Sequence, residues 1–286
     1  MNSSKFYMFV KWINHDMCNK GLQLKIGLNT DTIPFSPTGD CVPGGIYYCL
    51  AKDAMIWTGL GYTHLSTIEV PKDSQTVHFS SKSRSDKIII LDTPVPFKEH
   101  KMWEDIDICK LVLQQSAWSL KYVKIQTDEM CKLAVKENGL TLYDVKVQTD
   151  KICKLALKQN GLALEYVKLQ TDEICKLAVQ QDGLALKYVK LQTDELCKLA
   201  VKQNGYAIQY VKIQTNELCK LTVNQHGCAL YYVKIQTDEL CKLAVKQNGH
   251  AIQYVKIQTH ELCKLAVKQN DKALKDVTKI NKLVVQ

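Results

Sequence analysis

The sequence predicts an α+β N-terminal domain followed by an all-α solenoid of short helical-hairpin repeats. A 22-residue unit recurs through the C-terminal two-thirds of the 286-residue chain, and residues 193–214, TDELCKLAVKQNGYAIQYVKIQ, are typical of it. All six prolines lie before residue 105, in a region that lacks the repeat. A fixed period of this length is typical of solenoids. We therefore predict an α+β module over residues 1–104 and about eight repeats over residues 105–286.

Each repeat begins with the features of a helix N-terminus. Thr193 is a good N-cap residue because its side-chain oxygen can accept a hydrogen bond from the first turn. Acidic residues follow, where the helix dipole favours negative charge. Apolar residues then recur at helical spacing as far as Val201. The helix is predicted to stop at Asn204-Gly205, with the glycine in the left-handed conformation that often follows a helix.

A second short helix, carrying Ala207 to Ile213, completes the predicted hairpin. An Asn-Gly pair between apolar stretches is also typical of a β-turn, so a β-solenoid stays as the alternative. The capping residue, the order of the charges and the apolar stripe all favour helices. Helices of about ten residues are marginal alone and become stable by stacking on their neighbours.

Eight of the twelve cysteines also recur at 22-residue intervals, at positions 109, 131, 153, 175, 197, 219, 241 and 263. Such regularity indicates one buried position of the repeat and not a set of disulfides. No Cys-x-x-Cys pair or zinc-like Cys/His spacing occurs in the sequence. We therefore expect free, mostly buried thiols, no metal and no cofactor.

The net charge of +9 belongs to the repeats. Residues 1–105 hold 11 basic and 11 acidic residues, whereas residues 106–286 hold 27 lysines against 18 acidic residues. A first lysine row follows the repeated cysteines, and a second lysine row comprises Lys124, Lys146, Lys168, Lys190, Lys212, Lys234 and Lys256. Acidic residues interrupt the rows, so we expect nucleic-acid binding to be at most weak, sequence-blind and dependent on salt.

The near-identical units favour a non-enzymatic scaffold that binds a protein over a reader of bases, which would need varied polar side chains. Residues at positions that differ between copies are predicted to select the partner, namely Tyr206, Asn216, His226, His250 and His260. The second lysine row is predicted to contribute to the same binding surface. No apolar stretch approaches the roughly 18 residues of a membrane helix, and the N-terminal FYMFV run is too short for a signal peptide. We therefore expect no membrane partner and no secretion.

The repeats resemble a family of uncharacterised short helical repeats that is abundant in giant, Mimivirus-like viruses of amoebae. The strings ELCKLAVKQNG, residues 195–205, and ALKYVK, residues 185–190, carry the resemblance. It implies a helical fold and no established reaction. It also implies a partner in the infected host and a location in the host cytoplasm or the virion.

Residues 27–49 resemble an N-terminal module that precedes ankyrin-type repeats in giant-virus proteins. More distantly, PGGIYYCLAKDAMIW, residues 43–57, and STIEVPKDSQTV, residues 66–77, resemble ADP-ribosyltransferase-type domains. That resemblance implies that His15 and Tyr47 would position NAD and that Glu69 would polarise the ribose. His15 lacks the Gly-Thr or Gly-Ser that follows it in such domains, and Glu69 lies inside a predicted strand. We therefore expect the fold without the chemistry.

Overall fold

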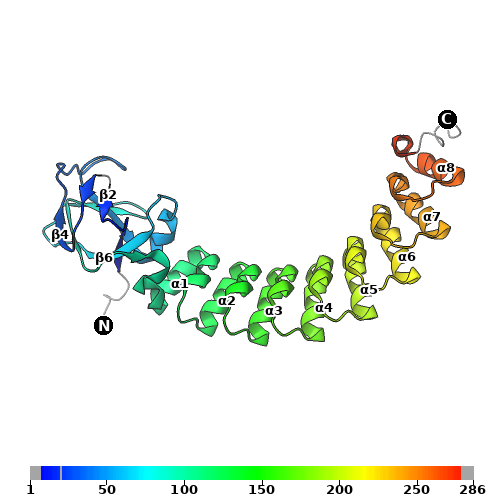
Figure 1. Cartoon of the computed structure of the whole chain (residues 1–286), viewed down its shortest axis with the longest axis horizontal. Helices are drawn as coiled ribbons and strands as arrows, with labels where there is room; N and C mark the ends of the chain where they lie inside the picture. Colours follow the sequence, from blue (N-terminus) through cyan, green and yellow to red (C-terminus); the bar gives the residue numbers. More distant parts are fainter. Residues whose placement is uncertain (1–7, 20, 278–286) are drawn as a thin grey trace. The chain divides into compact units, whose positions relative to one another are not determined.

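The structure, a computed structural model, describes residues 8–19 and 21–277 (Figure 1). The chain divides into two compact units, residues 1–137 and residues 138–286. The first unit contains a β-sheet, the first repeat and the α-helix of the second repeat, and the second unit contains helical repeats alone. The predicted fold class, an α+β region followed by helical repeats, is confirmed.

The first unit is built on an antiparallel sheet whose strands run in the order β4-β9-β6-β1-β5-β8-β7. Its central strand β1 pairs with β5 on one side and β6 on the other. Ile13, Ile46, Ile68 and Ile88 are buried in the core beside it. The strands are β1 (Phe9–Ile13), β4 (Gly27–Thr30), β5 (Ile46–Leu50), β6 (His64–Glu69), β7 (Thr76–His78), β8 (Ser83–Ser85) and β9 (Lys87–Ile90), with β10 (Val95–Pro96) beside β6 and a separate pair, β2 (Cys18–Asn19) and β3 (Leu22–Gln23).

The sequence of the first region predicts strands at residues 6–12, 45–50, 65–70, 76–80 and 87–91 and a helix at residues 51–60. Five observed strands, β1, β5, β6, β7 and β9, coincide with these, although the predicted start of the first strand, at Phe6, lies outside the described residues. The predicted helix at residues 51–60 is a shorter 3-10 helix, η1 (Ala51–Trp57). Strands β4 and β8 were not predicted. β4 is a four-residue edge strand, and β8 has the sequence Ser-Arg-Ser, so neither shows the apolar alternation of a typical strand.

The sheet region covers the first repeat within the first unit. Helix α1 (Ile106–Gln115) packs against η1 and against the 3-10 helix η3 (Lys101–Glu104). The rings of Phe97, Trp103 and Tyr122 lie 5.1–5.3 Å apart by their centroids. The apolar end of the first repeat is therefore shielded from water. The remaining elements of this unit are η2 (Phe97–Glu99), η4 (Ala117–Tyr122) and α2 (Asp128–Glu137).

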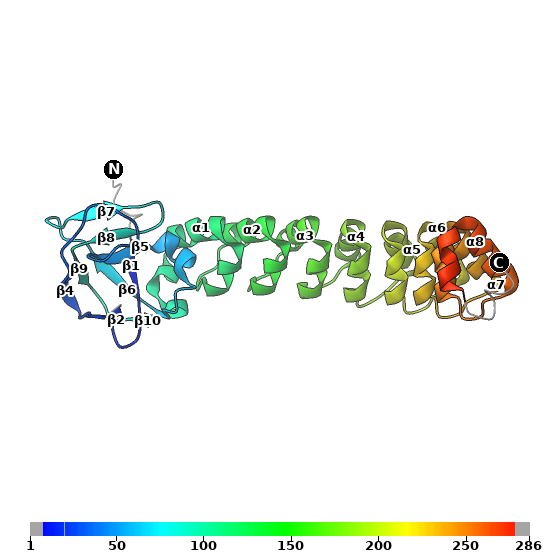
Figure 2. The same ribbon diagram turned by 90° about the horizontal axis from the view of Figure 1, so that it is seen from above.

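The second unit stacks its repeats in chain order, each made of a 10-residue α-helix and a 6-residue 3-10 helix (Figures 1 and 2). α-Helices pack on α-helices and 3-10 helices on 3-10 helices, which gives two layers. The α-helices are α3 (Asp150–Gln159), α4 (Asp172–Gln181), α5 (Asp194–Gln203), α6 (Asn216–Gln225), α7 (Asp238–Gln247) and α8 (His260–Gln269). The 3-10 helices are η5 (Gly139–Asp144), η6 (Gly161–Tyr166), η7 (Gly183–Tyr188), η8 (Gly205–Tyr210), η9 (Gly227–Tyr232), η10 (Gly249–Tyr254) and η11 (Asp271–Asp276).

The predicted caps are present, whereas the predicted role of the repeat glycine is wrong. Thr193 accepts a hydrogen bond from the backbone of Leu196 at 3.2 Å, as an N-cap does. Gly205 and its counterparts do not have positive φ. Each begins a 3-10 helix, after an extended residue such as Asn204. The glycine is needed for a close approach instead, because a Cβ on Gly183 would lie 2.5 Å from the carbonyl oxygen of Ala200 in the next repeat.

The repeated cysteines are free and buried, as predicted. Burial raises the pKa of the Cys109 thiol to about 12, and burial raises the pKa of the counterparts from Cys153 to Cys263 as well. Because the thiolate is the reactive form, these cysteines are chemically quiet packing residues.

Candidate functional site

A ladder of glutamines connects the repeats of the second unit. The side-chain amide of Gln192 donates to the Tyr210 carbonyl of the next repeat at 2.9 Å, and its oxygen accepts from the Lys212 backbone N–H at 3.0 Å. The same pair of bonds recurs at Gln148, Gln170, Gln214 and Gln236. This glutamine therefore serves the stack and is not a partner-binding residue. Its role was missed from the sequence, although its regular 22-residue spacing is visible there.

The first lysine row is largely neutralised by the protein itself. Lys198 lies 3.2 Å from Glu217 of the following repeat, and Lys220 lies 2.7 Å from Glu239. Equivalent pairs in the second unit join Lys154 to Glu173, Lys176 to Glu195 and Lys242 to Glu261. These carboxylates are mostly exposed, so each pair contributes little stability. They do remove the first row as an uninterrupted stripe of positive charge.

Five lysines of the second lysine row, from Lys168 to Lys256, keep their charge, whereas Lys124 of the same row pairs with Glu104 at 2.8 Å. The ammonium group of Lys190 donates to the Lys168 carbonyl at 3.3 Å, and that of Lys212 donates to the Lys190 carbonyl at 3.1 Å. Lys168, Lys234 and Lys256 reach the carbonyl of the preceding repeat in the same way. Their hydrogen-bond acceptors are neutral, and no carboxylate pairs with these five lysines in the described part of the chain. These five lysines therefore follow the stack as a line of positive charge.

An exposed aliphatic side chain follows each lysine of the second row. Leu191 is 86% exposed and Ile213 is 80% exposed, although both are large apolar residues. We name the aliphatic row by its six members in the second unit: Val147, Leu169, Leu191, Ile213, Ile235 and Ile257. All are at least 74% exposed. Exposed aliphatic side chains scattered over a surface need no explanation. An exposed aliphatic side chain at the same position of six consecutive repeats, however, forms a continuous line.

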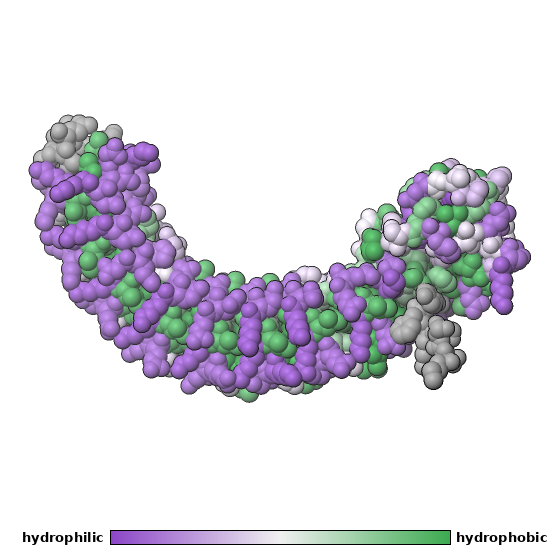
Figure 3. Space-filling view, turned by 180° about the vertical axis from the view of Figure 1, so that it is seen from behind, coloured by the Kyte–Doolittle hydropathy of each residue, from purple (hydrophilic) through white to green (hydrophobic). Residues whose placement is uncertain are grey.

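Hydrophilic side chains cover much of the repeats, and apolar patches recur between them from one repeat to the next (Figure 3). The inward face of each repeat is already occupied, because Leu196, Ala200 and Val201 are at most 4% exposed. The aliphatic row is thus separate from the core and available to a partner.

The residues predicted to select a partner divide into two groups. Asn216 and His226 are exposed, and Tyr206 is at the margin of exposure at 36% while its ring packs near those of His226 and Tyr232. His250 is only partly exposed, and its Nδ1 lies 2.6 Å from Asp276. The ring nitrogen Nδ1 of His260 is buried and lacks a hydrogen-bond partner within the described structure. Variation between copies therefore reflects packing at some positions and exposure at others.

His226 also marks a weak point in the stack. At the equivalent position of the preceding repeat, Asn204 accepts a hydrogen bond from the Tyr206 backbone N–H at 3.0 Å and so caps the following 3-10 helix. His226 makes no such side-chain bond. We expect His226→Asn to raise the free energy of unfolding by about 1 kcal/mol, the usual value of such a cap. Urea denaturation of the full chain measures it, and Asn204→His is the reverse control, expected to lower stability by a similar amount. Equal stability of wild type and both variants would contradict the prediction.

The three residues that the resemblance to ADP-ribosyltransferase-type domains singles out, His15, Tyr47 and Glu69, lie on different parts of the sheet region. The ring of His15 lies 5.9 Å from that of His64, at the start of β6, whereas Glu69 ends the same strand. Five residue steps along a strand separate those ends by roughly 16 Å. The Tyr47 hydroxyl donates to the Val42 carbonyl at 3.2 Å. The structure thus places His15 near one end of β6 and Glu69 at the other, with Tyr47 on β5.

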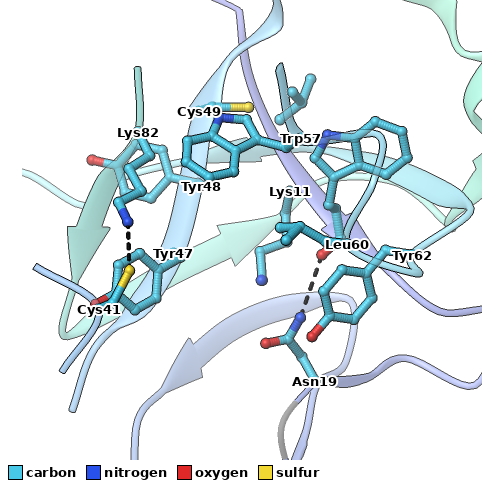
Figure 4. Close-up of a pocket in the computed structure, with 12 residues that line it drawn as sticks. Lys11, Asn19, Cys41, Tyr47, Tyr48, Cys49, Trp57, Leu60, Tyr62 and Lys82 are labelled. Atoms are coloured by element: carbon cyan, nitrogen blue, oxygen red, sulfur yellow. Dashed lines mark hydrogen bonds between the residues drawn. The ribbon is translucent and has the colours of Figure 1, made fainter. Parts of the chain in front are cut away.

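Tyr47 instead lines a cavity of about 240 Å³ beside β1 and β5, together with Lys11, Trp57, Tyr62 and Lys82 (Figure 4). Among residues 8–19 and 21–277, no group of three His, Cys, Asp or Glu side chains is arranged to hold a metal ion. No helix within those same residues is long and apolar enough to span a membrane.

Comparison with known proteins finds a family match within the repeats. Residues 149–192 and 171–214 match a family model described as a domain of unknown function, DUF4116. These two overlapping segments cover the repeats that contain α3, α4 and α5. No curated protein and no solved structure matches the chain.

Proposed function

We propose that the repeats are a non-enzymatic scaffold that binds a protein partner along the aliphatic row. The observation that carries the proposal is the row itself, six aliphatic side chains at least 74% exposed. Burying one such side chain contributes about 1.5–3 kcal/mol, so several acting together would support a specific complex. We further propose, from the resemblance to giant-virus repeats, that the partner is met in an infected host cell or in the virion.

The neighbouring charges favour an acidic partner. The second lysine row precedes the aliphatic row residue by residue, and the ammonium groups of Lys190 and Lys212 donate to neutral backbone carbonyls. An amphipathic helix with aliphatic residues and carboxylates would match both rows. Packed helices lie about 8–10 Å apart, so the row offers a side chain at roughly that interval. Seven residues of an α-helix advance about 10.5 Å, which brings every seventh residue of a partner helix close to register.

Phosphate-backbone binding is the second candidate, and the five charged lysines from Lys168 to Lys256 favour it. The neutralised first lysine row and the aliphatic row weigh against it, because phosphates gain nothing from exposed isoleucines. The two functions differ in salt dependence. Nucleic-acid affinity falls by a slope of about −0.9 per contacted phosphate on duplex DNA, whereas apolar contacts persist at high salt.

The test compares full-length wild type with Leu191→Asp/Ile213→Asp in capture from an extract of infected host cells. Both side chains are exposed, so the substitutions are expected to change stability little. Gln180→Asp, on the exposed surface of α4, controls for the added negative charge. We expect a protein held by wild type and by Gln180→Asp, and retained at least tenfold less by the double variant.

The same captured material decides between the two candidates. Retention of identical proteins by the double variant would contradict binding along the aliphatic row. Titration with labelled duplex DNA and single-stranded RNA at low and near-physiological salt completes the comparison. Tight binding that the double variant keeps, and that Lys190→Gln/Lys212→Gln loses, would replace the protein scaffold by a phosphate-binding function.

A further inference from the structure

We propose that the cavity in the N-terminal region binds a small, flat and uncharged aromatic molecule of about two fused rings. The cavity lies beside strands β1 and β5 and the end of η1 (Figure 4). Its volume of about 240 Å³ equals the space of about eight water molecules, which suits a molecule of that size. Such a site is independent of the function proposed for the repeats.

The walls of the cavity are largely aromatic. Tyr47 comes from β5, Trp57 is the last residue of η1, and Tyr62 follows η1 in the chain. All three side chains are half-buried, and Figure 4 shows their rings around one space. Leu60, an apolar residue that is 58% exposed, lies at the edge of that space. Aromatic rings that keep part of their surface open to a cavity can stack on a planar ligand.

The aromatic wall is held in place before a ligand arrives. The Trp57 indole N–H donates to the Ser81 carbonyl at 3.1 Å. Trp12, which also lines the cavity and is 7% exposed, donates its indole N–H to the Ala54 carbonyl at 3.1 Å. Because both rings are already ordered, binding costs little side-chain entropy. Their N–H groups are used inside the protein, so these rings offer a ligand an apolar surface and not a hydrogen bond.

The charged groups of the wall favour an uncharged ligand. Lys82 pairs with Asp40 at 2.5 Å and donates to the Cys41 sulfur at 2.9 Å. Lys11 is 3% exposed and is likewise engaged within the protein. A carboxylate would therefore leave water without gaining an unpaired cation, which is unfavourable in an apolar site. A cationic ligand would face both ammonium groups, and no aspartate or glutamate lines the cavity among the residues that the structure describes.

Lys82 also favours an aromatic ligand over a saturated one. Its ammonium group lies 5.2 Å from the centre of the Tyr47 ring and 5.3 Å from that of the Trp57 ring. A cation attracts the π face of an aromatic ring, and this attraction remains when the cation also has a hydrogen-bond partner. An electron-rich ring that joins this cluster is therefore favoured over an aliphatic ring of the same size.

The test uses three probes of the full-length protein: 2-naphthol, which is flat and uncharged at neutral pH, its saturated analogue trans-2-decalol, and the anion 2-naphthoate. Isothermal titration calorimetry should show one naphthol per chain and at least tenfold weaker binding of each of the other two probes. Tyr62→Leu, which removes one ring and keeps an apolar side chain, should reduce naphthol affinity at least fivefold. Tyr143→Leu makes the same change at a tyrosine of the repeats that is 70% exposed, and it should bind naphthol as wild type does.

Alkylation of Cys41 locates the bound molecule in the unaltered protein. Cys41 is exposed and lines the cavity, whereas Cys228 is a partly exposed cysteine of the repeats. Saturating naphthol should slow the reaction of Cys41 with N-ethylmaleimide at least threefold and leave the reaction of Cys228 unchanged. Peptide mass spectrometry measures both rates.

The proposal is overturned by naphthoate or decalol that binds as tightly as naphthol, or by no binding of naphthol at millimolar concentration. It is equally overturned by naphthol binding that survives Tyr62→Leu and leaves Cys41 unprotected. If Tyr62→Leu does not fold, the ranking of the three probes and the protection of Cys41 in wild type decide. Neither result bears on capture of a protein by the repeats, so the two proposals fail separately.

Discussion

Gly183→Ala is expected to destabilise the second unit by about 1–3 kcal/mol, whereas Gly205→Ala is expected to be nearly neutral or stabilising. A Cβ on Gly183 would lie 2.5 Å from the Ala200 carbonyl oxygen and 2.7 Å from the Gln203 side-chain oxygen. That glutamine accepts from the Gly183 backbone N–H at 2.5 Å. The added methyl group therefore forces the next repeat outward and strains this hydrogen bond, which is the usual cost of overpacking.

Gly205 is the matched control because the atom nearest to it in the next repeat belongs to a side chain, whereas the atom nearest to Gly183 is a backbone carbonyl oxygen. A methyl group added at Gly205 would lie nearest to His226 Nδ1, at 2.8 Å, on a side chain that can rotate, and the nearest carbonyl is 3.4 Å away. Replacing glycine by alanine also reduces the freedom of the unfolded chain by a similar amount at both sites. The difference between the two variants thus isolates the contact between repeats. Chemical denaturation of both full-length variants measures it, and equal effects would contradict the close-approach role.

The sequence alone predicted the period, the helix starts and the buried cysteines, because each follows from local rules. A threonine that precedes apolar residues at helical spacing, as Thr193 does, is a favourable N-cap wherever it occurs. The role of Gly205 was mispredicted because a glycine in an Asn-Gly pair after a helix commonly adopts the left-handed conformation that ends the helix. At the equivalent Gly183, the determining contact lies one repeat away, at the carbonyl oxygen of Ala200. Local pattern cannot show that contact.

The aliphatic row was visible in the sequence but was assigned to the second helix. Ile213 lies in the connection after the 3-10 helix that ends at Tyr210, and it points into solvent. Amphipathic patterning over so short a segment does not say which apolar residue is buried, since Val211 is 2% exposed and Ile213 is 80% exposed. The cavity beside β1 was equally unpredictable, because Lys11, Tyr47 and Tyr62 come together only through strand pairing.

Gln192→Leu is expected to have the second large effect, a loss of about 1–3 kcal/mol in the stability of the stack. The substitution keeps a similar volume and removes the bonds to the Tyr210 carbonyl and the Lys212 N–H. The Tyr210 carbonyl is partly buried, and such a group left without its partner costs about 1–3 kcal/mol, whereas water can replace the partner of the Lys212 N–H at the exposed surface. Both groups belong to the next repeat, so the variant weakens the contact between repeats and leaves the helix α5 itself intact.

Gln209→Leu provides the control, because the Gln209 amide donates to Tyr206 within its own repeat, at 3.0 Å and near the surface. We expect that variant to change stability by less than about 0.5 kcal/mol. Native-state hydrogen exchange then locates the effect. The Lys212 amide should lose its protection in Gln192→Leu and keep it in Gln209→Leu, while the equivalent Lys256 amide, bound to Gln236, should stay protected in both. Because repeat arrays unfold in parts, this local readout is sharper than a single melting temperature. A Lys212 amide that stays protected in Gln192→Leu would show that the glutamine ladder does not hold adjacent repeats together.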